Sequence, residues 1–141
     1  MKTITGETIG TVRWILRLEG LGILIAALLV YAKLGFNWGD FTLFFLTPDI
    51  SLLGYFAGSK IGALTYNTAH TYLGAIICLI SGFLVPAPAL SCAGIIWCAH
   101  IGFDRALGYG LKYATGFGFT HLGVIGQFAK LQHQLSARHE K

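Results

Sequence analysis

The sequence alternates long apolar stretches with short polar turns, and this pattern predicts an all-α membrane protein. Four apolar stretches of about 20 residues cover residues 12–33, 38–56, 61–84 and 89–107. A helix of that length rises about 30 Å, which matches the hydrocarbon core of a bilayer. Because the turns between the stretches are short, we expect an antiparallel bundle of four transmembrane helices in one domain over residues 1–141.

Proline and glycine residues mark an expected kink and a long loop. Pro48 lies inside the second stretch and removes a helical hydrogen bond, so we expect a kinked helix with Asp49 beside the kink. A glycine-rich loop follows the fourth stretch over residues 108–123. Apolar residues then recur at helical spacing over residues 124–136, which predicts an amphipathic helix on the membrane surface.

The composition supports the membrane class and decides what the charge means. Of the 141 residues, 55% are hydrophobic and 11% are charged, whereas about a quarter are charged in soluble domains. The net charge of +4 does not indicate nucleic-acid binding, because the basic residues lie at the ends of the apolar stretches. The three cysteines lie within apolar stretches without CxxC spacing, so we interpret them as small apolar side chains.

The basic residues also predict an orientation. In an antiparallel bundle, the starts of the first and third helices lie on the same side as the ends of the second and fourth. Every Lys and Arg except Lys33 falls on that side. By the positive-inside rule, we expect this side and both termini to be cytoplasmic.

Ionisable side chains gather on the same side. His100 and Asp104 are four residues apart near the end of the fourth stretch, so they share one helix face. The bundle brings toward them further acidic and imidazole groups: Glu19, Asp49, His70 and, from the loop, His121. Ionisable groups within a membrane span are costly, so the group is a functional-site hypothesis.

Mixed imidazole and carboxylate groups are ligands typical of Zn²⁺, Mn²⁺ or Fe²⁺, with zinc expected first. A bound cation would also offset the repulsion between buried carboxylates. The metal ligands that we predict are Asp49, His70, His100 and Asp104, with Asn67 as a further ligand or a supporting partner. Three basic side chains on that side, Arg17, Arg105 and Lys112, are expected to bind an anionic substrate.

Each of these residues also has a purely structural explanation. Glu19 can pair with Arg17 or face water, and Asp49 can accept a backbone N–H freed by the proline. His70 can bridge two helices by a hydrogen bond. His100 and Asp104 can form an isolated hydrogen-bonded pair, and His121 can be a histidine of the loop or the membrane interface. The tyrosines on this side are interpreted as anchors at the membrane interface: Tyr66, Tyr72, Tyr109 and Tyr113.

Five motifs carry a resemblance to a known family. They are residues 17–20 (RLEG), 48–55 (PDISLLGY), 66–72 (YNTAHTY), 99–113 (AHIGFDRALGYGLKY) and 120–123 (THLG). On these motifs the chain resembles a bacterial membrane family called domain of unknown function 4260. The resemblance implies a protein of the bacterial cytoplasmic membrane, and it implies no established activity.

A more distant similarity rests on the order of three motifs. Pro48-Asp49-Ile50, then His70, then His100 with Asp104 resemble the pattern of membrane-bound metal-dependent hydrolases. In that pattern a second aspartate stands where this chain has Ser51, and one histidine of a pair is missing around His70. The similarity therefore implies a hydrolase that binds fewer metal ions, or one that has lost its activity.

Three functions follow as hypotheses. The first is a metal-dependent membrane hydrolase acting on a lipid-like or phosphoester substrate at the cytoplasmic leaflet, with Glu19 or His121 as general base or acid. The second is a small transporter that uses the same residues as an ion or proton relay. The third is a haem protein with His70 and His100 as axial ligands. The expected partners are membrane lipids and a second copy of the chain.

Overall fold

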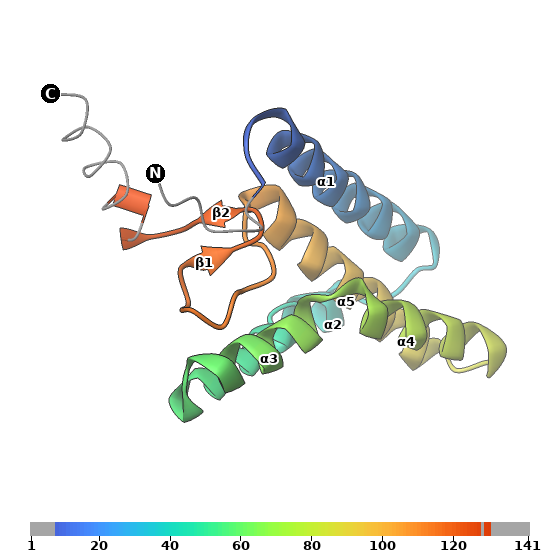
Figure 1. The fold of residues 1–141 in the computed structure, drawn as a ribbon. Coiled ribbons are helices and arrows are strands. Elements are labelled where there is room, and N and C mark those ends of the chain that lie inside the picture. Colours follow the sequence, from blue (N-terminus) through green and yellow to red (C-terminus); the bar gives the residue numbers. More distant parts are fainter. Residues whose placement is uncertain (1–7, 128, 131–141) are drawn as a thin grey trace, which may run out of the picture.

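The computed structural model describes residues 8–127 and 129–130, and this part of the chain is mostly helical (Figure 1). The segments in chain order are α1 (Gly10–Lys33), α2 (Trp38–Phe44), the 3-10 helix η1 (Thr47–Ala57), α3 (Ser59–His70), α4 (Tyr72–Leu84) and α5 (Pro88–Leu107). A hairpin of two short strands, β1 (Phe119–Thr120) and β2 (Gly123–Val124), follows α5.

Helix α5 is the centre of the fold, because α1 and α4 both pack against it. Gly20 of α1 lies against Gly102 of α5, whereas Tyr31, further along α1, lies against Cys92, earlier on α5. The two helices therefore run antiparallel. A Cβ atom on Gly102 would lie 2.7 Å from the carbonyl oxygen of Gly20, so glycine at both positions permits backbone contact.

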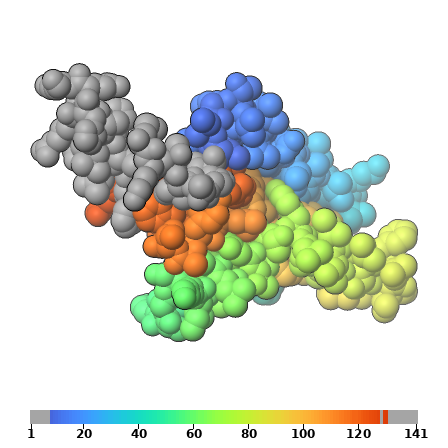
Figure 2. All heavy atoms as spheres, in the orientation of Figure 1, coloured from blue at the N-terminus to red at the C-terminus, as the bar shows by residue number. Residues whose placement is uncertain are grey.

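Helix α4 also runs antiparallel to α5. Gly74 near its start lies against Trp97, and Gly82 near its end lies against Ser91. The outer ends of α1 and α4 stand apart on the face that Figure 2 shows, with an apolar groove between them that includes Ile23 and Phe83.

The expected continuous but kinked helix over residues 38–56 is wrong, because this segment forms two separate helices. The short helix α2 ends at Phe44, and η1 begins at Thr47 with Pro48 in its first turn. Pro48 has no backbone N–H to continue the hydrogen bonding of α2, so the chain restarts as a 3-10 helix. Its first turn contains Asp49.

The third apolar stretch is also divided, which the sequence did not predict. Thr71 has an extended backbone between α3 and α4, and Figure 1 shows the two helices meeting at an angle. In an unbroken helix, the carbonyl groups of Ala69 and His70 would accept from the following turn. Here the indole N–H of Trp97 donates to Ala69 and the guanidinium of Arg105 donates to His70. Side chains of α5 thus satisfy the carbonyl groups that the break leaves free.

The glycine-rich loop contains local structure that was not expected. Phe119 pairs with Val124 in the hairpin, and Lys112 pairs with Thr120. The predicted amphipathic helix over residues 124–136 therefore does not begin at residue 124, because Val124 belongs to β2. Most of that prediction lies outside the described residues.

Two helical segments of the described part are long and apolar enough to cross a membrane. They are Gly10–Lys33 and Ser59–Leu84, and the second includes the bend between α3 and α4. Both expose large apolar side chains, among them Leu29 and Phe83, as expected of a surface that contacts lipid or a partner. The four-span topology and the orientation stay predictions.

Candidate metal centre

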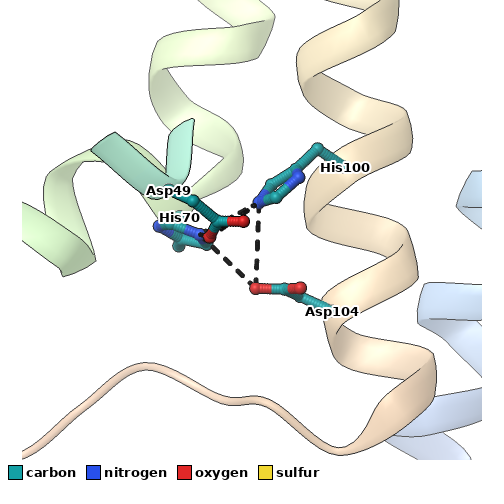
Figure 3. Close-up of side chains that lie close together, drawn as sticks. All are labelled: Asp49, His70, His100 and Asp104. Carbon is teal, nitrogen blue, oxygen red and sulfur yellow. Dashed lines mark hydrogen bonds and ion pairs between the residues drawn. The ribbon is translucent and has the colours of Figure 1, made fainter. Parts of the chain in front are cut away.

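The four aspartate and histidine residues predicted as metal ligands come together in space, and we call them the cluster. Asp49 lies in the first turn of η1, His70 ends α3, and His100 and Asp104 are one turn apart on α5. Figure 3 shows the four side chains pointing toward a common centre. One ligand atom from each lies within 4.8 Å of all the others, so this group could hold a metal ion.

Five of the six separations between these atoms are close to those of a tetrahedral site. His70 Nε2 lies 3.1 Å from His100 Nε2, 3.3 Å from Asp49 Oδ1 and 3.4 Å from Asp104 Oδ2. His100 Nε2 lies 3.5 Å from Asp49 Oδ1 and 3.9 Å from Asp104 Oδ2. Atoms about 2.1 Å from a tetrahedral ion are about 3.4 Å from one another. These five separations fit Zn²⁺, which takes four such ligands, and the sixth, between Asp49 and Asp104, is at most 4.8 Å.

The hydrogen-bond donors at the cluster are too few for its acceptors. His70 Nδ1 lies 3.0 Å from the carbonyl oxygen of Tyr66, so in the neutral ring Nδ1 carries the proton and Nε2 presents a lone pair. That lone pair faces a carboxylate oxygen of Asp49 and one of Asp104. Acceptors at such distances repel unless a proton or a cation lies between them. A metal ion satisfies all of them together.

The two histidines are oriented by different forces. The hydrogen bond to the Tyr66 carbonyl fixes the ring of His70. His100 Nδ1 is buried without a hydrogen-bond partner among the described residues, and its ring packs edge-on against Phe45. The orientation of His100 therefore depends on packing in the core.

Access to the cluster is one-sided. The side chains of His70 and His100 are 2% and 1% exposed, and that of Asp104 is 14% exposed. The side chain of Asp49 is 36% exposed. Water and small molecules therefore reach the cluster from the side of Asp49.

Tyr66 belongs to the site, and its interpretation as an interfacial anchor is wrong. Its ring stacks on that of His70 with the centroids 3.7 Å apart, and its hydroxyl donates to Asp104 Oδ2 at 3.0 Å. The side chain is buried. The four-residue spacing from Tyr66 to His70 places both on one helix face, and this was the signal available in the sequence.

Arg105 connects the cluster to the glycine-rich loop. Its guanidinium donates to the carbonyl oxygen of His70 at 3.2 Å and lies 3.5 Å from both ring nitrogens of His121. His121 Nδ1 accepts from the N–H of Leu111, so Nε2 carries the proton of the neutral ring. Burial, together with the positive charge of Arg105, lowers the pKa of His121 below its usual value. His121 is therefore neutral at pH 7 and is not among the four clustered groups.

Lys112 and Asn67 hold the loop on α3. The side chain of Asn67 accepts from the N–H of Lys112 at 2.7 Å and donates to its carbonyl oxygen at 2.8 Å. The ammonium group of Lys112 donates to the carbonyl oxygen of Phe117 and lies over its ring. Burial lowers the pKa of Lys112 to about 8. The amide of Asn67 is thus engaged with the loop, which fits the supporting role, while its role as a ligand stays a prediction.

Replacing Asn67 by alanine is expected to loosen the loop without emptying the cluster. Two hydrogen bonds to the backbone of Lys112 are lost, which costs about 1–3 kcal/mol of local stability. Hydrogen exchange at the Lys112 amide should become faster, while metal content stays unchanged. Asn37→Ala, which removes the N-terminal cap of α2, is the matched control and should leave that amide protected. Equal exchange in Asn67→Ala and the parent protein would contradict the assignment.

The structure places the other predicted site residues around the cluster or away from it. Glu19 is exposed on α1 and is not one of the four groups that gather. Arg17 donates to the carbonyl oxygen of Ala106 at 2.9 Å and lies over the ring of Trp14. The catalytic role of Glu19 and the substrate-binding role of Arg17 stay predictions.

The distances disfavour the haem hypothesis. Two axial nitrogens on opposite sides of a haem iron are about 4 Å apart, twice a metal–nitrogen bond of about 2 Å. The Nε2 atoms of His70 and His100 are 3.1 Å apart. Two carboxylate groups also lie against the same atoms, where the porphyrin plane would have to pass.

Fold and site together define a mostly helical protein with helices of membrane-spanning length and a candidate metal centre where its helices break. Residues 13–125 match the family described as Domain of unknown function (DUF4260), and the chain belongs to this family. This confirms the resemblance that the five motifs indicated. Comparison with curated proteins and with solved structures gave no match.

Proposed function

We propose that the protein is a metal-dependent membrane hydrolase that cleaves an ester or phosphoester bond of a lipid-like substrate. The observation that carries the proposal is the convergence of one ligand atom each from Asp49, His70, His100 and Asp104, all within 4.8 Å of one another. Four protein ligands would fill a tetrahedron, so a catalytic water would have to bind as a fifth ligand, from the side where Asp49 is partly exposed. The setting is the bacterial cytoplasmic membrane, with the site near the cytoplasmic leaflet.

The chemistry is the addition of water across the ester bond. The water oxygen bonds to phosphorus or to the acyl carbon, and the bond to the alcohol oxygen breaks. One proton of the water passes to that alcohol oxygen, and the other remains with the acid product. A divalent cation, when bound, makes water more acidic and polarises the ester oxygen.

The residues around the cluster supply proton transfer and charge. In its protonated form, His121 is suited to donate a proton to the leaving alcohol, because its lowered pKa makes the imidazolium a stronger acid. Glu19 is the second candidate for proton transfer. Arg105, which contacts both His70 and His121, binds the anionic part of the substrate together with Lys112 and Arg17.

The test separates chemistry from metal binding. Detergent-purified, zinc-loaded protein should hydrolyse lipid phosphate monoesters or carboxylic esters, and a chelator should abolish this turnover. His121→Gln or Glu19→Gln should lower kcat about 100-fold with the metal retained, the scale of a lost general acid or base. Lys60→Gln, which neutralises an exposed charge outside the cluster, is the control. A metal-loaded protein that turns over no compound of either class would refute the hydrolase.

A second candidate function is ion handling, and the breaks in the helices favour it. The chain breaks before Pro48 and at Thr71, and both breaks lie beside cluster residues. Interrupted helices that bring polar groups together within a membrane protein are typical of transporter sites. A transporter this small is expected to function as a homo-oligomer. Ion flux into liposomes, without hydrolysis, would favour this function over the first.

A further inference from the structure

An apolar cavity of about 780 Å³ lies beside the candidate metal centre. Its walls come from α2, from the start of η1 and from the first half of α5. Along α5 the wall runs from Pro88 to Trp97, a distance of about 14 Å at 1.5 Å per residue. Ala89 and Ala93 are exposed on this wall, and their small side chains leave the space open.

The cavity and the cluster share a wall. Pro48, Ala69 and Trp97 line the cavity. Pro48 directly precedes Asp49, Ala69 directly precedes His70, and Trp97 stands just under one turn before His100. The N–H of Trp97 donates to the carbonyl oxygen of Ala69 at 2.6 Å, so the wall is held by the same contact that accommodates the break after α3.

We propose that this cavity binds the hydrocarbon chain of a lipid whose polar group lies at the metal cluster. The lining is almost wholly apolar, and the volume is in the range of about 300–1,000 Å³ that is usual for small-molecule sites. Asp40 lies in the wall of α2, whereas Thr47 and Ser51 lie beside the cluster. A lipid hydrocarbon chain that follows α5 from Trp97 toward Pro88 would therefore begin near Thr47 and Ser51, beside the cluster where the proposed chemistry takes place. The placement of the lipid's polar group at the cluster rests on the proposed function. The binding of the lipid's hydrocarbon chain in the cavity does not.

The second apolar groove, between α1 and α4, provides a control surface. It is about 550 Å³ in volume and includes Ala26, an exposed small residue like Ala93. No residue of the cluster has its direct chain neighbour among the lining residues of this groove. Binding there would say nothing about the site.

The test uses Trp97 as a reporter. Trp14 and Trp38 are replaced by phenylalanine, so that Trp97 is the one remaining tryptophan. Its fluorescence is measured in detergent micelles with phosphatidic acid whose acyl chains carry bromine, a contact quencher, either near the ester or near the chain end. The bromine near the ester should quench Trp97 more strongly. Ala93→Phe fills the space one turn from Trp97 and should reduce quenching several-fold, whereas Ala26→Phe should not.

Each outcome decides the inference. Equal quenching in the parent, Ala93→Phe and Ala26→Phe proteins would overturn binding in the cavity. Stronger quenching by bromine at the chain end would overturn the proposed direction of the lipid. The measurement needs neither metal nor turnover, so elemental analysis and hydrolysis assays on the same preparations show independently whether the proposed function fails.

Discussion

Protein that carries both Asp49→Ala and His100→Ala is expected to contain no zinc, whereas the parent contains about one equivalent. Each substitution removes one of the four ligand atoms that lie within 4.8 Å of one another. The remaining His70 and Asp104 cannot enclose an ion, because two ligands leave half of a tetrahedron to water. Elemental analysis after purification without chelator, and again after adding zinc, manganese or iron, measures the difference.

The matched control for this prediction is Asp40→Ala combined with His121→Ala. It also removes one carboxylate and one imidazole, but both lie outside the cluster. Its zinc content should equal that of the parent. A parent protein that takes up no metal even after the additions would eliminate both the metal centre and the hydrolase.

Gly20→Leu is expected to destabilise the protein by about 3 kcal/mol, the upper part of the range for overpacking. A Cβ atom on Gly20 would collide with the Cβ of Arg105 and would lie 2.9 Å from the carbonyl oxygen of Gly102. The backbone of α5 cannot move aside as the end of a long side chain can. A displaced α5 would also carry Asp104 away from the cluster, so metal affinity should fall together with the melting temperature.

Gly22→Leu is the control on the same helix. A Cβ atom at Gly22 would meet nothing within 4 Å, so this larger side chain faces open space. Melting temperature in detergent and metal content should both match the parent. If Gly20→Leu melts at the same temperature as Gly22→Leu, the close contact between α1 and α5 does not contribute to stability.

The gathering of the metal ligands was predictable from two regularities. The four-residue spacing of His100 and Asp104 places them on one face of a helix. The alternation of apolar stretches places the end of the fourth beside the start of the third, where His70 lies. These arguments say only on which side of the bundle a residue lies, so they placed Glu19 and His121 beside the ligands as well. The structure brings in Asp49 and His70 and leaves Glu19 exposed.

Tyr66 shows what such arguments miss. Tyrosine near the end of an apolar stretch is usually an interfacial anchor, and the four-residue spacing from Tyr66 to His70 was the one local signal against that interpretation. Its place in the site depends on the position of Asp104, which comes from α5. A contact between two elements far apart in the chain, such as that of Tyr66 with Asp104, cannot be recognised from the sequence of either element alone.

The sequence by itself determined the helical class, the apolar segments long enough to span a membrane, the family and the types of ligand available, because hydrophobic periodicity and residue chemistry are local properties. Only the tertiary structure decided that α3 ends at His70, since the carbonyl groups freed there are satisfied by Trp97 and Arg105 of another helix. It also decided which four polar groups meet, because glycine contacts between α1 and α5 and the packing of α4 fix where α5 stands.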